Sequence, residues 1–319
     1  GANPRMEAPV LNARIRKHWL NTGLPIAAIG SKASLTYPVE WLSDSPEVLS
    51  DLVSGKHAFA KLLKDAKKPL IIIGQSALVH KDAKEIYAAA RALAQEVDAV
   101  GKEWTGFNML HTAAARVGAM DVGFLPAKGG RDTAAMLEGS RTGAIEMLYL
   151  LGVDELDMSQ IGANCFVIYQ GHHGDNGAHR ADVILPAAAY TEQDGTYVNM
   201  EGRVQRSYQA VTPPGEARPD WKIIRAVSDV LGKTLAFDDL QTLRDKMAKV
   251  TPVLAKLEVV ADEVLSTIRQ RKTFTFEGGN IPQYFANYYM TDAISRASET
   301  MAECTSVFMG KSGKKKEAA

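Results

Sequence analysis

The chain has 319 residues, enough for a sizeable core in one or two domains. Its 37 basic and 37 acidic side chains cancel, so the overall charge favours neither nucleic acid nor an acidic membrane surface as a partner. Hydrophobic residues make up 46% and charged residues 23%, which is typical of a globular protein, and the apolar runs are far too short to span a bilayer. We therefore expect no binding to nucleic acid and no direct insertion into a membrane.

The two cysteines, Cys165 and Cys304, argue against a disulfide scaffold and indicate a reducing compartment. An iron–sulfur cluster needs about four thiolates or equivalent ligands, so we do not expect this chain alone to hold one. Residues 1–4 have the composition of a turn that follows a strand, and the sequence shows no initiator Met, signal peptide or transit peptide. We expect the chain to start inside a fold, with the upstream part supplied by further sequence or by a second polypeptide.

Apolar runs that end in glycine predict buried strands, and helical periodicity occupies the stretches between them. The strands are expected at 26–29, 70–73, 147–151 and 165–171. Helices are expected at 14–20 and 82–97, the second of them capped by Asp82. This alternation predicts an α/β fold, with an open, mostly parallel sheet and helices on both faces.

The segment 181–232 carries a series of strand, turn and breaker signals. A short strand is expected at 183–185, and a second one at 196–199 between two glycine-containing turns. Apolar residues at helical spacing then predict a helix over 220–231. We expect the ring of Trp221, near the start of this helix, to be buried against the sheet.

Beyond residue 235 the pattern becomes mostly helical. Helices are expected at 240–250, 254–268 and 291–303, and residues 310–319 are expected to form a mobile, solvated tail that contains Lys314, Lys315 and Lys316. We therefore divide the chain into an α/β domain over 1–235, incomplete at its N-terminus, and a helical C-terminal extension over 236–319.

His172, His173, Asp175 and His179 form the densest cluster of potential metal ligands. Their spacing fits no common zinc pattern, and the glycines at 171, 174 and 177 indicate a strand-to-helix loop. We interpret the segment as a structural or interface loop; a metal or ligand contact is the alternative.

Three acidic residues, Glu192, Asp194 and Glu201, could be read as paired carboxylates for acid–base chemistry, but turn formation explains Asp194 without catalysis. The sequence also lacks a G-x-G-x-x-G motif after any expected strand, so a nicotinamide site is not supported. We name no catalytic residue, no cofactor-binding residue and no metal ligand in this chain.

Several stretches in order carry a resemblance to a known family. The series ADVILP at 181–186, E-x-DGTYVN-x-EGRVQ at 192–205 and PPGEARPDW at 213–221 is similar to the molybdopterin oxidoreductases. More narrowly, the chain resembles the C-terminal part of the 75 kDa iron–sulfur subunits of NADH:ubiquinone oxidoreductase, respiratory complex I. That resemblance extends over the further stretches 1–17, 168–186, 219–226 and 288–304.

The resemblance implies a fold that once gripped a large, multiply charged cofactor. Residues 1–4 and the turns at Gly30, Gly74 and Gly152 are candidate remnants of loops that faced phosphate groups. The complex I branch keeps the fold without the cofactor, so the resemblance implies a structural role in a core subunit and no cofactor bound by this chain.

The same resemblance implies partners and a location. The upstream half of these subunits carries one 2Fe–2S and two 4Fe–4S clusters. Together with other peripheral-arm subunits, that half would pack against this chain on the matrix side of the mitochondrial inner membrane. Two alternatives stay open: the catalytic part of a molybdopterin- or tungstopterin-dependent oxidoreductase, and a separate ligand-binding module that uses the loop 172–179.

Overall fold

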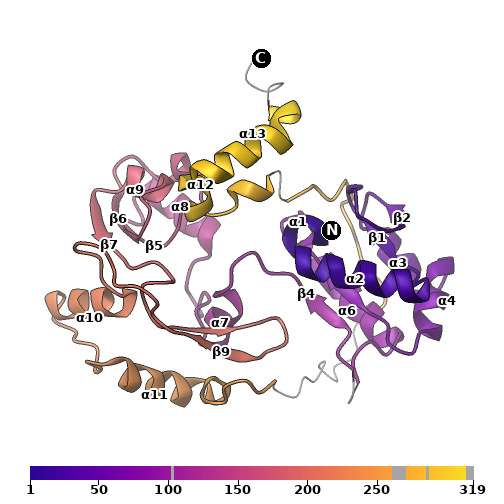
Figure 1. Cartoon of the computed structure of the whole chain (residues 1–319), viewed down its shortest axis with the longest axis horizontal. Coiled ribbons are helices and arrows are strands. Elements are labelled where there is room, and N and C mark those ends of the chain that lie inside the picture. The colour runs from indigo at the N-terminus through magenta and orange to yellow at the C-terminus, as the bar shows by residue number, and fades with distance from the viewer. Residues whose placement is uncertain (102–103, 261–270, 285–286, 314–319) are drawn as a thin grey trace. The chain divides into compact units, whose positions relative to one another are not determined.

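The computed structural model describes residues 1–101, 104–260, 271–284 and 287–313. Contacts divide the chain into two compact units, which Figure 1 shows together with their elements. Unit 1 contains residues 1–113 and 261–288, and unit 2 contains residues 114–260 and 289–319. The predicted boundary between residues 235 and 236 falls inside the second of these units, and the division into a domain and an extension stays a prediction.

Unit 1 alternates short parallel strands with helices. Strand β1 is parallel to β2, and β3 is parallel to β4. A single hydrophobic cluster includes residues of both strand pairs, of α3 and of α6, where buried alanines allow close packing. The elements are α1 Pro4–Glu7, α2 Pro9–Thr22, β1 Ala27–Ile29, β2 Glu40–Ser43, α3 Val48–Val53, α4 Ala58–Asp65, β3 Ile71–Ile73, α5 Gln75–Leu78, α6 Ala83–Glu96 and β4 Phe107–Met109.

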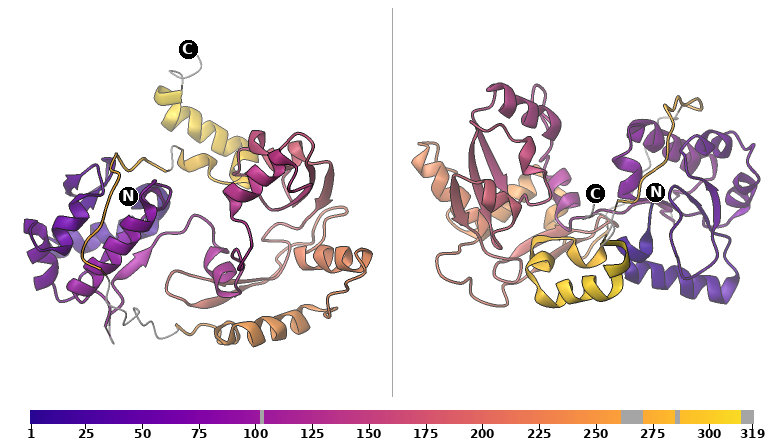
Figure 2. Two further views of the ribbon diagram at one scale, coloured as in Figure 1. Left: turned by 180° about the vertical axis from the view of Figure 1, so that it is seen from behind. Right: turned by 90° about the horizontal axis from the view of Figure 1, so that it is seen from above.

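Unit 2 is built on a three-stranded parallel sheet in the order β5-β6-β7, whose strands lie side by side in Figure 2. The central strand contributes Val167 and Tyr169 to a core that also receives Leu137 and Ala178 from two helices. The elements of the sheet region are α7 Arg116–Asp121, α8 Thr133–Thr142, β5 Met147–Leu151, η1 Met158–Gln160, β6 Phe166–Gly171, α9 Asn176–Arg180 and β7 Val183–Pro186.

The rest of unit 2 contains an antiparallel hairpin and several helices. Strand β8 pairs with β9 so that Val198 lies opposite Val204, and Gly202 takes a positive φ of 77° in the turn between them. The elements are β8 Gly195–Val198, β9 Val204–Ser207, α10 Asp220–Val230, α11 Leu240–Val250, η2 Pro252–Ala255, η3 Tyr288–Met290, α12 Ala293–Ala297 and α13 Glu299–Gly313.

The expected fold class is confirmed: the structure is α/β with mostly parallel sheets and a helical C-terminal part. Within the described residues, however, the strands belong to several small sheets and not to one continuous sheet. The helix expected at 254–268 was wrong over its described part, because Pro252–Ala255 is a 3-10 turn and 256–260 is not helical; residues 261–270 lie outside the described residues.

Two further differences concern the C-terminal helices. The helix expected at 291–303 is broken at Ser298 into α12 and α13. Helix α13 runs on to Gly313, into the segment expected to be a mobile tail, and residues 314–319 with their three lysines lie outside the described part of the chain. Of the helices in the described ranges, none combines the length and the apolar character needed to cross a bilayer.

Candidate functional site

In unit 1, the glycines expected to face a cofactor lie at the carboxyl ends of β1 and β3. There Gly30 and Gly74 pack against the backbone of Gly1 and Ala2. A Cβ placed on Gly30 would lie 3.4 Å from Gly1 Cα and 3.4 Å from Ile281 Cβ. A Cβ on Gly74 would lie 2.7 Å from the nitrogen of Ala2, which is closer than real Cβ atoms come to a neighbour. Gly30 also has a φ of 117°, a conformation that favours glycine. These glycines therefore allow backbone to pack on backbone.

A second segment covers the same edge of unit 1. Residues 277–284, which we call the strap, follow the core-packed Phe274 and Phe276 and cross the ends of β1, β2 and β3. The strap is fixed mainly through its backbone. Ser31 Oγ donates to the carbonyl of Ile281 at 2.8 Å, the Ile281 amide donates to the carbonyl of Asp44 at 3.0 Å, and the Tyr284 amide donates to Ser76 Oγ at 3.0 Å.

Asp82 binds the other end of the strap. Its two carboxylate oxygens accept the amides of Glu277 and Gly278, each at 3.0 Å. The sequence predicted that Asp82 would cap its own helix; it occupies the N-cap position of α6, but its side chain makes no capping hydrogen bond there. Burial alone would raise the pKa of Asp82, yet the two strap amides and the nearby His80 and Lys81 hold that pKa below its usual value.

The residues at this edge do not fit a molybdopterin group. Such a cofactor is large and multiply charged, so it needs a concave site with free backbone amides or cationic side chains. Here Ile281, only 1% exposed, fills the space beside Gly30, and the strap already uses Ser31, Ser76 and the Asp82 carboxylate. A buried apolar side chain and a carboxylate are both unfavourable neighbours for phosphate. That the chain binds no cofactor at all stays a prediction.

In unit 2, the histidine cluster follows β6 as expected. The two Nδ1 atoms of His172 and His173 lie 2.6 Å apart, and the rings make an edge-to-face contact with centroids 4.8 Å apart. Burial, followed by the neighbouring His173, lowers the pKa of His172 and so favours the neutral ring. His179 lies on α9 and is not in this pair.

The carboxylates around this loop already have partners within the fold. Asp175 accepts a hydrogen bond from Nε of Arg296 at 2.5 Å. Asp154 accepts the hydroxyl of Tyr169 at 2.9 Å and the amide of Gly177 at 3.2 Å. Among the residues that the structure describes, no group of three or more His, Cys, Asp or Glu side chains is placed to hold a metal ion. These contacts favour the structural interpretation of the loop.

Each of the three candidate acid–base carboxylates has its own partner in a turn or loop. Glu192 accepts the Ala189 amide at 2.9 Å, Asp194 accepts the Gln209 amide at 2.8 Å, and Glu201 pairs with Arg203 at 3.5 Å. Each carboxylate that would do acid–base chemistry is thus used to shape a loop, as turn chemistry predicted for Asp194.

A polar network that the sequence did not indicate lies at the carboxyl end of β6. The side chain of Gln170, 0% exposed, accepts from the Tyr149 hydroxyl at 2.5 Å and donates to Asp220 Oδ1 at 2.6 Å. Gln193 donates to the other carboxylate oxygen of Asp220 at 2.7 Å and accepts the Asp220 amide at 3.1 Å. The network joins β5, β6 and the start of α10, and therefore connects the stretches that carry the family resemblance.

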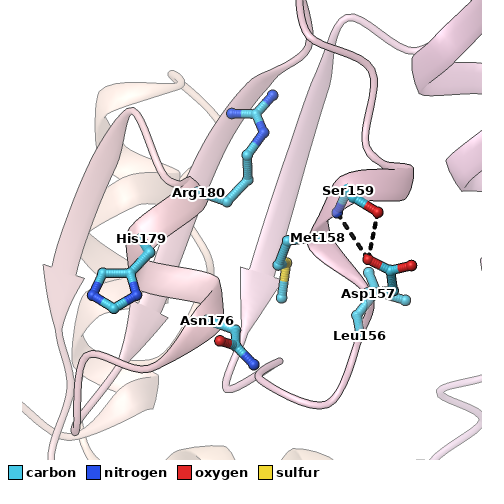
Figure 3. A pocket seen from close by; sticks show the side chains of 7 residues that line it. All are labelled: Leu156, Asp157, Met158, Ser159, Asn176, His179 and Arg180. Atoms are coloured by element: carbon cyan, nitrogen blue, oxygen red, sulfur yellow. Dashed lines mark hydrogen bonds between the residues drawn. The ribbon is translucent and has the colours of Figure 1, made fainter. Parts of the chain in front are cut away.

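An open depression lies between η1 and α9, and Figure 3 shows the side chains that line it. Asp157 accepts both the amide and the hydroxyl of Ser159, at 3.1 and 2.6 Å, as an N-cap of η1. Arg180 donates to the carbonyls of Gly162 and Cys165, each at 2.9 Å. Most of the polar groups here serve the local fold, so the depression has the character of a surface feature more than that of a binding site.

Comparison with known proteins defines the class. The model of the molybdopterin oxidoreductase family matches residues 1–230. A second family model, which describes the C-terminal region of one NADH-ubiquinone oxidoreductase subunit, matches residues 259–304 and includes the whole strap. The chain belongs to the molybdopterin oxidoreductase family.

Individual relatives point to one kind of subunit. The chain is 42% identical to the NADH-ubiquinone oxidoreductase 78 kDa subunit, mitochondrial, of Neurospora crassa, over 96% of this chain and 41% of that protein. It is 41% identical to the 75 kDa subunit of Reclinomonas americana, over 97% of this chain and 44% of that protein. It is 37% identical to the NADH dehydrogenase (ubiquinone) iron-sulfur protein 1, mitochondrial, of Solanum tuberosum, over 96% of this chain and 40% of that protein. The chain thus spans about two fifths of each relative.

Proposed function

We propose that this chain is a structural, non-catalytic portion of a core subunit of respiratory complex I. The relatives with 37–42% identity are named as the 75 or 78 kDa subunit or iron-sulfur protein 1 of NADH dehydrogenase. One observation supports the proposed non-catalytic role. The strap, which lies within the second family match, covers the edge of the fold where Gly30 and Gly74 follow β1 and β3.

The proposed role is to support electron transfer from NADH to ubiquinone without taking part in it. The clusters, one 2Fe–2S and two 4Fe–4S, would be held by the upstream half of the subunit, and this chain would pack against that half and other peripheral-arm subunits on the matrix side of the inner mitochondrial membrane. The two cysteines support the proposal that the clusters are held outside this chain, because Cys165 is buried in the core of unit 2 and Cys304 lies on α13.

The test uses the chain inside assembled complex I, with NADH:quinone activity normalised to the amount of complex. A variant in the histidine loop, His172→Ala, should assemble and retain turnover within roughly twofold of the parent, because neither reaction nor electron carrier is assigned to it. Val10→Ala, at an exposed position, is the matched control. A His172→Ala complex that assembles fully but loses turnover would overturn the structural role.

The alternative, a catalytic part of a molybdopterin-dependent oxidoreductase, makes a different prediction. Elemental analysis and pterin fluorescence of the purified native complex should detect no molybdenum, tungsten or pterin in proportion to this subunit. Stoichiometric metal with pterin would replace the proposal by the enzyme alternative. The mass of the native subunit is a further check: the chain itself is 34.6 kDa, so a value near that figure indicates a split subunit.

A further inference from the structure

A cavity of unit 2 lies between the β8–β9 hairpin and helix α11. Its volume is about 190 Å³, and its lining comes from both strands of the hairpin, from α11 and from the turn η2. Part of the lining is apolar, since Met247 and Leu254 belong to a hydrophobic cluster with Val198 and Val204 of the hairpin. The cavity is therefore bounded by elements that pack on one another within a single unit.

Arg206 lies on the side of the hairpin that faces this cavity. Thr196 is its cross-strand partner, and Val198 lies opposite Val204. Because side chains alternate along a strand, Thr196 and Arg206 share their face of the hairpin with the two buried valines. A guanidinium group is thus placed on the face that carries apolar core residues.

Arg244 lines the same cavity from α11. Positions 241, 244, 247 and 248 are spaced three or four residues apart, so they lie on one face of the helix. Met247 joins this face to the hydrophobic cluster of the hairpin, and Arg244 lies one turn before it. The two arginines therefore reach one cavity from two different elements.

Neither guanidinium group is paired within the described residues. The Nε atom of Arg206 and the Nε and Nη2 atoms of Arg244 are buried there without a hydrogen-bond partner, and neither side chain takes part in an ion pair. A buried charge without a partner is unfavourable, and buried polar atoms in folded proteins nearly always have one. These three donors are therefore free to bind an acceptor that enters the cavity.

One acidic residue also lines the cavity. Asp245 follows Arg244 directly, and adjacent residues on a helix do not face each other. The Asp245 side chain is exposed, and its Oδ1 accepts a hydrogen bond from Nε2 of Gln241 at 2.8 Å. With two arginines against this one aspartate, the lining keeps a net positive charge.

We propose that this cavity binds a small oxyanion, whose phosphate or carboxylate group is held by the guanidinium groups of Arg206 and Arg244. The planar guanidinium group matches two oxygens of such a ligand and gives charge-assisted hydrogen bonds. The cavity of about 190 Å³ is smaller than the roughly 300–1,000 Å³ of pockets for drug-sized ligands. It has room for a phosphate ion or a short carboxylic acid, but not for a whole nucleotide or pterin.

The site is separate from the glycine turns of unit 1 and from the histidine loop. Arg206 lies within the first family match, whereas Arg244 lies in the stretch 231–258, which neither family model covers. The binding of an oxyanion here therefore does not depend on the proposed role in complex I.

Calorimetric titration of the 319-residue chain tests the site with two probes, inorganic phosphate and acetate, in chloride buffer of constant ionic strength. We expect one phosphate to bind per chain, and acetate to bind more weakly because it carries less charge. Arg206→Gln and Arg244→Gln should each weaken phosphate binding by roughly tenfold. Lys246→Gln is the matched control, because it removes an exposed positive charge from the same helix at a position that does not line the cavity.

Asp245→Asn should change the affinity in the opposite direction. Removal of the one negative charge in the lining should strengthen phosphate binding by roughly threefold. Because Asp245 is exposed and asparagine can still accept the hydrogen bond from Gln241, this variant should keep its fold. The comparison therefore holds even if an arginine variant fails to fold.

Thermal unfolding gives a second readout. Phosphate at about 10 mM should raise the thermal midpoint of the parent and of Lys246→Gln more than that of either arginine variant, because a ligand that binds only the folded state stabilises it. Phosphate also stabilises proteins through its exclusion from their surface, but that effect acts on all variants alike.

Three results would overturn the proposal. The first is a chain that binds neither probe, and the second is phosphate binding that is unchanged when either arginine is replaced. In both cases water alone would solvate the buried donors. The third is an equal loss of binding in Lys246→Gln, which would show a general effect of charge and no defined site.

Discussion

The amide of Gly278 donates a hydrogen bond to Oδ2 of Asp82 at 3.0 Å, across 196 positions of sequence. The neighbouring amide of Glu277 is bound in the same way by Oδ1. A carboxylate at the start of α6 therefore holds a segment from the far end of the chain, and it makes no capping bond to its own helix. This pair of contacts fixes one end of the strap over unit 1.

Removing the Asp82 carboxylate should release the strap. Asp82→Ala leaves two strap amides without their acceptor, whereas Asp82→Asn keeps one acceptor oxygen and should have a smaller effect. We expect a lower thermal midpoint and faster amide exchange at Glu277 and Gly278, measured by calorimetry and by hydrogen exchange. The control is Asp65→Ala, at an exposed position of α4. Unchanged exchange at the two strap amides in Asp82→Ala would show that other contacts hold the strap.

The apolar anchor of the strap should contribute as a core residue does. Ile281 is 1% exposed and belongs to the hydrophobic cluster of unit 1. Ile281→Ala is expected to lower the free energy of unfolding by about 2–5 kcal/mol, through lost burial and a residual cavity. Val10→Ala, at a side chain 76% exposed, should change it by less than about 0.5 kcal/mol. Denaturant titration measures both, and similar values for the two variants would contradict the assigned packing.

The buried amine of Gly1 predicts a pH dependence for the 319-residue chain. Its pKa falls from 8.0 to about 6 on folding, so between these values the unfolded state binds more protons. Below about pH 6 the folded state carries the full penalty of the buried charge, and stability should rise as the pH is raised to about 8. The total gain is roughly 2–3 kcal/mol for a shift of this size. Acetylation of the amine should abolish this slope; a slope that persists after acetylation must come from another group.

The buried network in unit 2 offers a matched pair of substitutions. Gln170→Leu removes the partner of Tyr149 and one of the partners of Asp220 and should cost about 1–3 kcal/mol of stability. Gln209→Leu changes an exposed glutamine whose side chain donates to the nearby Val211 carbonyl, so its effect should be small. Thermal or denaturant unfolding measures the stability of both variants. A Gln170→Leu chain as stable as the parent would mean that the network contributes no net stability.

Truncation of Trp221 should lower the free energy of unfolding by less than a fully buried ring would predict. The sequence predicted a ring buried against the sheet; in the structure the side chain is half-buried and contacts Phe237, with ring centroids 6.3 Å apart. We therefore expect Trp221→Ala to lower stability by about 1–2 kcal/mol, below the roughly 3–5 kcal/mol of a fully buried aromatic. Unfolding measurements test this value. In assembled complex, activity per complex should stay unchanged, and a selective loss of turnover would contradict that expectation.

The elements that could be predicted from sequence are those with a strong local signal. The expected strands at 165–171 and 183–185 match β6 and β7 within a residue, and the helix at 240–250 coincides with α11. Apolar runs closed by glycine or proline, and apolar residues at helical spacing, are set by the local chain. The predicted burial of Trp221 was wrong, because periodicity identifies the apolar face of α10 but not how much of that face another element covers.

The strap and the Gln170 network could not be predicted in this way. Residues 277–284 have no helical or strand periodicity, and their two glycines indicate only a break in regular structure. Their hydrogen bonds are made by backbone groups to partners about 200 positions away, for which the sequence holds no pattern. A glutamine inside an apolar strand, such as Gln170, likewise gives no sign of the carboxylate that it meets in the fold.

The strap also sets an order of events during synthesis. Residues 1–113 leave the ribosome before the strap, which emerges only after residue 276, when all of 114–260 has already been made. The contacts of highest sequence separation in unit 1 must therefore form last, and until then its strand ends and the site of Ile281 remain uncovered. A chain that stops before the strap would contain a first unit without its closing segment, although residues 114–260 of the second unit had already been synthesised.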